Sequence, residues 1–243
     1  MEAFEHLREL PGPFALIQGP PGTGKTYWLL RCLLPFLNAN VKTDTKHQLL
    51  ITIPTNDGVC RTAKDMHEAC LGMFGPTKQV TVVRVQHLPG SDPLSSSSQR
   101  ETLEILNTML HSTRTDSNVE LTYAHWMLRL SGIIPEGSKP DKYRSFRELF
   151  EMFRNRTFLD EEKQLQLCED TNTLLRAVLE MADVIVCTPF TAGHPTIVSV
   201  IKPAVVGVDE AAKFTEPDMW PIMANYYPSP ILMAGGHCQL GPR

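Results

Sequence analysis

An eight-residue run near the N-terminus carries the clearest chemistry in the sequence. It reads Gly19-Pro20-Pro21-Gly22-Thr23-Gly24-Lys25-Thr26. The run meets the pattern G-x-x-x-x-G-K-S/T at every specified position. Its glycines allow backbone N–H groups to approach phosphates closely, and a helix that begins after them adds partial positive charge. The sequence therefore predicts a phosphate-binding loop for a nucleoside triphosphate.

Two side chains of this loop have direct roles in phosphate chemistry. The Lys25 ammonium would reach the β- and γ-phosphates, and the Thr26 hydroxyl would bind Mg²⁺, whose other ligands are mostly phosphate oxygens and water. The local pattern suits these roles, because the apolar run 14–17 predicts a buried strand before the loop and a helical stretch begins at Thr26. A glycine-rich turn that binds no ligand stays open as the alternative.

A pair of carboxylates supplies the second half of a phosphate site. Asp209 and Glu210 directly follow the apolar run 204–208. Asp209 would hold the Mg²⁺ hydration shell opposite Thr26, and Glu210 would orient and deprotonate the water that attacks the γ-phosphate. Acidic pairs at strand ends also serve as helix caps. Beside a phosphate loop, however, the pair predicts Mg²⁺-dependent ATP hydrolysis.

The elements that position these residues form an alternating pattern of apolar runs and helical segments. Strands are predicted at 14–17, 49–53, 80–85, 184–187, 204–208 and 231–234. The alternation predicts an α/β fold, a three-layer RecA-like P-loop NTPase domain with a mainly parallel sheet. Each candidate site residue then lies at the carboxyl end of a strand, where ligands bind in such sheets.

A helical insertion is predicted to divide this domain, so that residues 1–86 and 182–243 form the ATP-binding core and 87–181 the insertion. Phe146, Leu149, Phe150 and Phe153 form one apolar helical stripe, and a second consists of Leu165, Cys168, Asn172, Leu175 and Leu179. A basic run comprises Lys139, Lys142, Arg144, Arg147, Arg154 and Arg156. Interspersed acidic residues favour a solvated helix face over a nucleic-acid groove.

Composition sets broad limits on the partners. The net charge of −4 gives no overall attraction to nucleic acid, so such binding would need a local patch. The six cysteines show no metal-type spacing. No segment resembles a signal peptide or is long enough to span a bilayer. We expect an intracellular protein, in the nucleus or the cytoplasm, with no membrane partner.

Five segments, taken in order, resemble the motifs of superfamily-1 helicases, above all of the nonsense-mediated-decay helicase group and its fungal relatives. The segments 17–26, 208–212 and 235–242 resemble motifs I, II and III. The segment 53–56 resembles motif Ia, and 182–188 resembles the stretch before motif II. The resemblance covers almost the whole chain but corresponds to only the first of the family's two RecA-like domains.

The resemblance implies an ATP-hydrolysing motor domain that acts on single-stranded RNA or DNA, with ATP and Mg²⁺ as cofactors. Gln239 would sense the γ-phosphate and join Lys25 and Glu210 as a catalytic residue. The residues along the single strand would be Pro54, Thr55, Asn56, Thr188 and Pro189. A second RecA-like domain from another chain or segment would complete the ATP site, so this chain alone would hydrolyse ATP slowly or not at all.

Two residues depart from the family pattern. Gly236 occupies a position where the family usually has aspartate, and Lys213 occupies one where many relatives have glutamine. Residues 1–13 contain no glutamine that could recognise the adenine of ATP, so the selectivity for the nucleotide base is not assigned. Direction of movement and the choice between RNA and DNA also stay open.

Two alternative functions follow from these features. A truncated or degenerate relative would bind nucleotide or nucleic acid without catalysis and regulate a partner. A ring-forming AAA-type ATPase is a minor alternative, because such proteins share the same loop sequence. The distance of 184 positions between Lys25 and Asp209 disfavours it, since those rings usually place the acidic strand some tens of residues after the lysine.

Overall fold

The computed structural model describes residues 13–39, 46–75, 80–86, 88, 96–112, 119–134 and 140–236. Residues 1–86 and 182–243 form one compact unit, and residues 87–181 form a second. We call them the sheet unit and the helical unit and describe each by itself.

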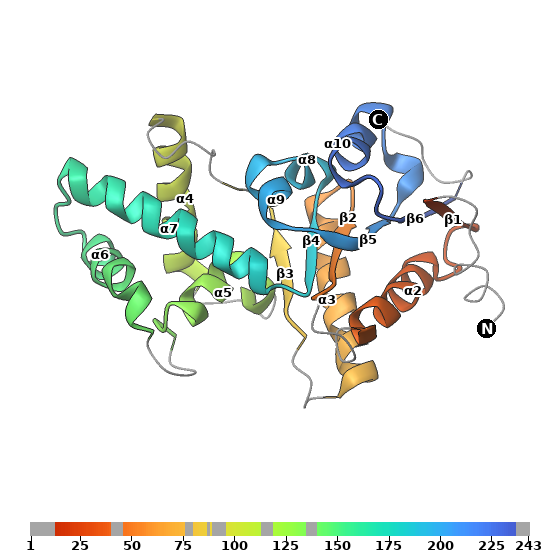
Figure 1. The fold of residues 1–243 in the computed structure, drawn as a ribbon, viewed down its shortest axis with the longest axis horizontal. Helices are drawn as coiled ribbons and strands as arrows, with labels where there is room; N and C mark the ends of the chain where they lie inside the picture. The colour runs from red at the N-terminus through yellow and green to blue at the C-terminus, as the bar shows by residue number, and fades with distance from the viewer. Residues whose placement is uncertain are drawn as a thin grey trace. The chain divides into compact units, whose positions relative to one another are not determined.

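The sheet unit is built on six parallel strands. They are β1 (Phe14–Gln18), β2 (Gln48–Thr52), β3 (Val82–Val85), β4 (Val184–Cys187), β5 (Pro203–Val208) and β6 (Ile231–Gly235). Their order in the sheet is β1-β6-β5-β2-β4-β3 (Figure 1). The central strands β2 and β4 are buried at every residue, which explains their continuous apolar sequences.

Helices cover both faces of this sheet. One face carries α2 (Lys25–Ala39) and α3 (Asn56–Phe74), and the other carries α8 (Pro189–Ala192), α9 (Pro195–Val200) and α10 (Glu216–Tyr226) (Figure 1). The short turn η3 (Ala211–Lys213) follows β5. The predicted three-layer α/β fold of RecA-like type is confirmed.

The core of the sheet unit forms where α2 crosses the middle strands. Leu29 and Leu33 of α2 are fully buried. Gly207 of β5 makes room for them, because a Cβ atom there would lie 2.8 Å from Leu33 Cδ1 and 3.8 Å from Leu29 Cδ1. This close approach brings the start of α2 to the carboxyl end of β5.

The helical unit contains four α-helices and two short 3₁₀ turns within the described residues. They are α4 (Ser96–Ser112), η1 (Val119–Leu121), α5 (Tyr123–Leu130), η2 (Asp141–Tyr143), α6 (Arg144–Arg154) and α7 (Glu161–Met181). The predicted stripe on α6 is confirmed at Phe146, Leu149 and Phe150, which are buried, while Phe153 is half-buried. The rings of Phe146 and Phe150 stack at 5.6 Å between centroids.

The predicted stripe on α7 is partly wrong. Leu165 and Asn172 are only half-buried, whereas Leu167, Leu174 and Val178 are in the core. The physical reason is that α7 packs against α4, α5 and α6, so its buried face is wider than one stripe.

Within the described part of the chain, no helix combines the length and the apolar character that a bilayer crossing requires.

We predict that Gly207→Val will lower the free energy of unfolding by about 1–3 kcal/mol, because the branched side chain would collide with Leu33 and Leu29 of α2. Gly72→Ala is the matched control, since a Cβ atom at Gly72 of α3 meets no atom within 4 Å. Alanine there should raise stability by up to about 1 kcal/mol through its helix propensity. Urea unfolding followed by circular dichroism measures both, and equal stability of native protein and Gly207→Val would contradict the packing described here.

Candidate active site

The predicted phosphate loop connects the end of β1 to the start of α2. Gly22 and Gly24 have φ angles of 77° and 76°, in the left-handed region where only glycine is unstrained. Thr23 Oγ1 donates a hydrogen bond of 2.8 Å to the Pro20 carbonyl, which closes the loop on itself. The Gly19 N–H donates to the Gly235 carbonyl at 3.3 Å and so ties the loop to β6.

Lys25 is the first residue of α2, one position before the predicted start. Its Nζ donates a hydrogen bond of 2.7 Å to the Pro20 carbonyl within the loop. The ammonium therefore lies over the loop backbone, where a bound phosphate would replace the carbonyl as its partner.

Thr26 and Asp209, the two predicted Mg²⁺ ligands, are in direct contact. Thr26 Oγ1 donates a hydrogen bond of 2.8 Å to Asp209 Oδ2, although 183 positions separate them in sequence. Asp209 follows β5, and its N–H donates to the Thr52 carbonyl at the end of β2 at 3.0 Å. Asp209 is only 4% exposed. Burial raises the pKa of its carboxyl group, while hydrogen bonds from Thr26 and from the Glu210 N–H oppose that rise.

The Thr26–Asp209 geometry fits a hydrated magnesium ion. A hydroxyl that donates its proton keeps oxygen lone pairs free for a cation, and Asp209 keeps acceptor capacity for a water of the ion's shell. Mg²⁺ takes few protein ligands when phosphates and water complete its octahedron. No group of three or more His, Cys, Asp or Glu side chains that could hold a metal ion occurs among the described residues.

Glu210 adopts a strained backbone conformation beside this pair. Its φ of 54° lies in the left-handed region, which is uncommon for a residue with a side chain and is concentrated at functional sites. Glu210 Oε2 accepts a hydrogen bond of 2.8 Å from Lys213 Nζ. Both side chains are partly exposed, at 32% and 37%.

A cavity of about 200 Å³ joins these groups. It is lined by Gly22, Gly24, Lys25, Thr26, Asp209 and Glu210. The volume lies below the roughly 300–1,000 Å³ of sites that enclose a whole small ligand, so it suits the phosphate end of a nucleotide. The predicted residues Gly19, Pro20, Pro21 and Thr23 belong to the loop but do not line the cavity, and Gln239 lies outside the described residues.

The residues predicted along a single strand lie at the ends of two neighbouring strands. Pro54, Thr55 and Asn56 follow β2, while Thr188 and Pro189 follow β4, which pairs with β2. None of the five lines the cavity described above. Thr55 and Thr188 each cap a helix, because their hydroxyl oxygens accept from the N–H groups of Gly58 and Thr191.

Sequence reasoning missed two residues at the carboxyl edge of the sheet. Phe190 follows Pro189 directly, and its side chain is 87% exposed. The sequence signal that could have identified Phe190 was its position just after the end of a predicted strand. Lys213 was noted only as a departure from the family, and its i, i+3 spacing to Glu210 was the signal for the ion pair.

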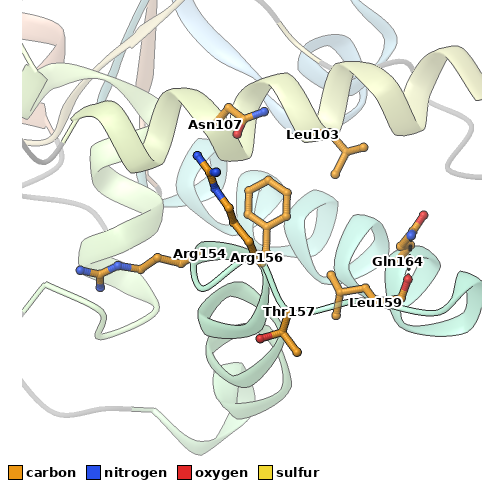
Figure 2. Close-up of a pocket in the computed structure, with 8 residues that line it drawn as sticks. Leu103, Asn107, Arg154, Arg156, Thr157, Leu159 and Gln164 are labelled. Carbon is orange, nitrogen blue, oxygen red and sulfur yellow. Dashed lines mark hydrogen bonds between the residues drawn. The ribbon is translucent and has the colours of Figure 1, made fainter.

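The helical unit has a cavity of its own, of about 470 Å³ (Figure 2). Its lining comprises Leu103, Asn107, Phe153, Arg154, Arg156, Thr157, Leu159 and Gln164. None of the residues predicted for phosphate chemistry or for the single strand is among them. Two of its arginines, Arg154 and Arg156, belong to the basic run.

Much of the described basic run has local partners. Arg144 pairs with Glu148 at 2.9 Å, and Arg154 pairs with Glu151 at 3.7 Å. Arg147 Nη1 donates to two backbone carbonyls at 2.8 Å each. These contacts favour the solvated helix face over the nucleic-acid groove.

A parallel sheet with a phosphate loop after β1 and an Asp-Glu pair after β5 defines a RecA-like P-loop NTPase domain. The family model described as "AAA domain" matches residues 1–243, and the chain belongs to this family. The chain is also similar along most of its length to proteins named as regulators of nonsense transcripts and to one named as an ATP-dependent helicase, which confirms the predicted kinship with superfamily-1 helicases of the nonsense-mediated-decay group.

Three relatives show the extent of this similarity. "Regulator of nonsense transcripts 1" of Dictyostelium discoideum is 27% identical over 96% of this chain and 14% of its own length. "ATP-dependent helicase upf1" of Schizosaccharomyces pombe is 28% identical over 96% of this chain and 21% of its own length. "Regulator of nonsense transcripts 1 homolog" of Drosophila melanogaster is 26% identical over 96% of this chain and 16% of its own length. The chain thus spans about a fifth or less of these relatives.

We predict that Asp209→Asn will stabilise the protein without nucleotide at pH 7. The raised pKa means that folding favours the protonated carboxyl, so the ionised form costs stability as pH rises from the unfolded value of 3.8 through the folded value. The amide removes that cost. The resulting gain in stability should shrink as the pH falls toward 3.8, where the native carboxyl is also protonated.

Asp160→Asn is the control of opposite sign, because hydrogen bonds from Lys163 lower the pKa of Asp160. This control should lose stability at pH 7. Urea midpoints of both variants at pH 7 and near pH 4 make the comparison, and a destabilised Asp209→Asn at pH 7 would contradict the assigned effect of burial.

Proposed function

We propose that the chain is the ATP-binding motor domain, the first RecA-like half, of a superfamily-1 helicase, which hydrolyses Mg-ATP in a manner coupled to single-stranded RNA or DNA. The observation that carries the proposal is the 2.8 Å hydrogen bond between Thr26 and Asp209. It joins the two halves of a phosphate site within one cavity that also contains Lys25 and Glu210. The relative from Schizosaccharomyces pombe is named an ATP-dependent helicase, which supports the same activity.

Each group in the cavity has one task in this proposal. The N–H groups around Gly22 and Gly24 and the Lys25 ammonium bind the phosphates. Thr26 and Asp209 hold Mg²⁺, which supplies charge neutralisation at the phosphates when bound. Glu210 accepts a proton from the attacking water. Lys25 is the cation among the described residues that line the cavity, and an arginine from a second RecA-like domain on another chain or segment is proposed to raise the rate.

The single strand is proposed to pass the carboxyl ends of β2 and β4. Pro54, Thr55 and Asn56 lie at one end and Thr188 and Pro189 at the other. The helix caps at Thr55 and Thr188 fix the backbone there, which suits contacts with the sugar-phosphate chain that do not depend on sequence. The helical unit, residues 87–181, is proposed to be an accessory insertion. Such a motor would work in the nucleus or the cytoplasm.

One observation favours a second function, nucleotide binding without catalysis. Gly236 has no carboxylate at the end of β6, where the family usually has one. A chain of this kind would regulate a partner through its nucleotide state. Hydrolysis by the purified chain separates the two functions.

The proposed catalysis predicts that Glu210→Gln will keep nucleotide binding and lower steady-state hydrolysis by about 100-fold or more, since it removes the general base. Lys25→Ala should lose both binding and hydrolysis, because the phosphates lose their cation. Phosphate release with Mg-ATP, with and without single-stranded RNA or DNA, measures the rates, and Lys25→Ala controls for contaminating ATPases. Equal hydrolysis by native chain and Glu210→Gln would exclude Glu210 as the base, and no hydrolysis by the native chain would favour the regulatory function.

The proposed strand path predicts that Phe190→Ala will weaken binding of single-stranded oligomers of about 16 nucleotides by about 5- to 150-fold. The exposed ring lies beside Thr188 and Pro189, where it can stack on a base. Phe190→Trp should retain binding, since it keeps an aromatic face. Phe158→Ala is the matched control, because Phe158 is 85% exposed but belongs to the helical unit. Fluorescence anisotropy measures the affinities, and unchanged binding in Phe190→Ala would reject this path.

A further inference from the structure

Lys213 is held in a fixed position relative to Glu210. The Lys213 N–H donates to the Glu210 carbonyl at 2.8 Å, which closes the turn η3, and the Lys213 Nζ donates to Glu210 Oε2 at 2.8 Å. One residue therefore binds both the backbone and the side chain of Glu210. The left-handed φ of Glu210 makes this possible, because it turns the chain back on itself.

β6 packs against the backbone of the same turn. A Cβ atom on Gly235 would lie 3.0 Å from the Ala212 nitrogen and 3.4 Å from Ala211 Cβ, so the turn packs directly on the end of the strand. The absence of a side chain at Gly235 allows this close packing of the turn on β6. The position from which Lys213 reaches Glu210 is thus set by the sheet as well as by the turn.

The two oxygens of Glu210 have different surroundings. Oε2 is bound by Lys213, whereas Oε1 has no hydrogen-bond partner among the described residues. The other charged groups that line the cavity are Lys25 and Asp209. Lys25 donates to the Pro20 carbonyl, and Asp209 accepts from Thr26 and from the Glu210 N–H. Neither of these two side chains makes a hydrogen bond to the Glu210 carboxylate, so Lys213 is the residue that anchors this carboxylate within the described part of the chain.

We propose that Lys213 is a positioning residue for hydrolysis: it anchors Oε2 of Glu210 so that Oε1 is presented to the attacking water. The inference rests on the proposed function and adds to it a residue that contacts neither phosphate nor metal. A glutamine at this position would offer a hydrogen-bond donor without a charge. The lysine instead forms a charge-assisted bond, which is stronger and shorter than a neutral one.

The first experiment uses the chain without nucleotide. In uniformly ¹⁵N-labelled protein, the Lys213 ammonium signal, assigned by its absence in Lys213→Met, should be observable at low temperature and should change in Glu210→Gln. The Lys202 ammonium serves as the reference signal, since Lys202 directly precedes β5 and lies outside the turn η3. A Lys213 signal that is identical in native chain and Glu210→Gln would overturn the proposal.

The second experiment separates positioning from binding. Lys213→Met should lower kcat for Mg-ATP by about tenfold or more, as expected for a misplaced general base, while KM and the equilibrium affinity for ATP stay within about threefold. Lys213→Arg should restore most of kcat because it keeps the charge. Lys202→Met, a matched loss of an exposed lysine, should behave as the native chain does, and thermal melts confirm that each variant is folded.

The outcomes distinguish this inference from the proposed function. If the native chain hydrolyses ATP and Lys25→Ala does not, a native kcat in Lys213→Met overturns the role of Lys213 alone. A faster Lys213→Met would also overturn it, since the ion pair would then restrain Glu210 instead of presenting it. If the native chain shows no hydrolysis that depends on Lys25, the proposed function fails first.

Discussion

The hydrogen bond from Thr26 to Asp209 is the contact on which the site depends. It joins the first turn of α2 to the residue after β5, and β6 lies between β1 and β5 in the sheet. The loop after β1 must therefore cross β6 before α2 can reach Asp209. The tie between Gly19 and Gly235, at the ends of β1 and β6, and the packing of Leu29 and Leu33 against Gly207 make that crossing possible.

The residues at this contact lower the stability of the fold. Asp209 is a nearly buried carboxylate whose pKa is raised by burial, and a hydroxyl and a backbone N–H only partly offset that burial. Glu210 beside it has a left-handed backbone, which costs about 1–3 kcal/mol at a residue with a side chain. Two neighbouring residues thus carry an electrostatic and a conformational cost. Such costs persist where the surrounding structure fixes the chain, as β5, β6 and η3 do here.

Several features could be predicted from the sequence because they depend on local pattern. Continuous apolar runs identified the strands, and parallel strands place their carboxyl ends at one edge, so Thr26 and Asp209 were expected to be opposite each other. The buried face of α7 could not be predicted in full, since it depends on how many helices surround it. The i, i+3 spacing of Lys213 to Glu210 was a signal for their ion pair, but the Glu210 φ of 54° at the start of the turn was not indicated by any residue pattern. The exposure of Phe190 depends in the same way on the tertiary structure around α8.

The most direct test of the account is a calorimetric titration of ATP into the native chain and into Thr26→Val, each with Mg²⁺ and with a chelator. The valine keeps the shape of threonine but has no hydroxyl to bind the cation or to contact Asp209. The account predicts that Mg²⁺ tightens ATP binding to the native chain and has little effect on binding to Thr26→Val. An equal gain from Mg²⁺ in both proteins, or none in the native chain, would contradict the assignment of Thr26 and Asp209 as the cation site.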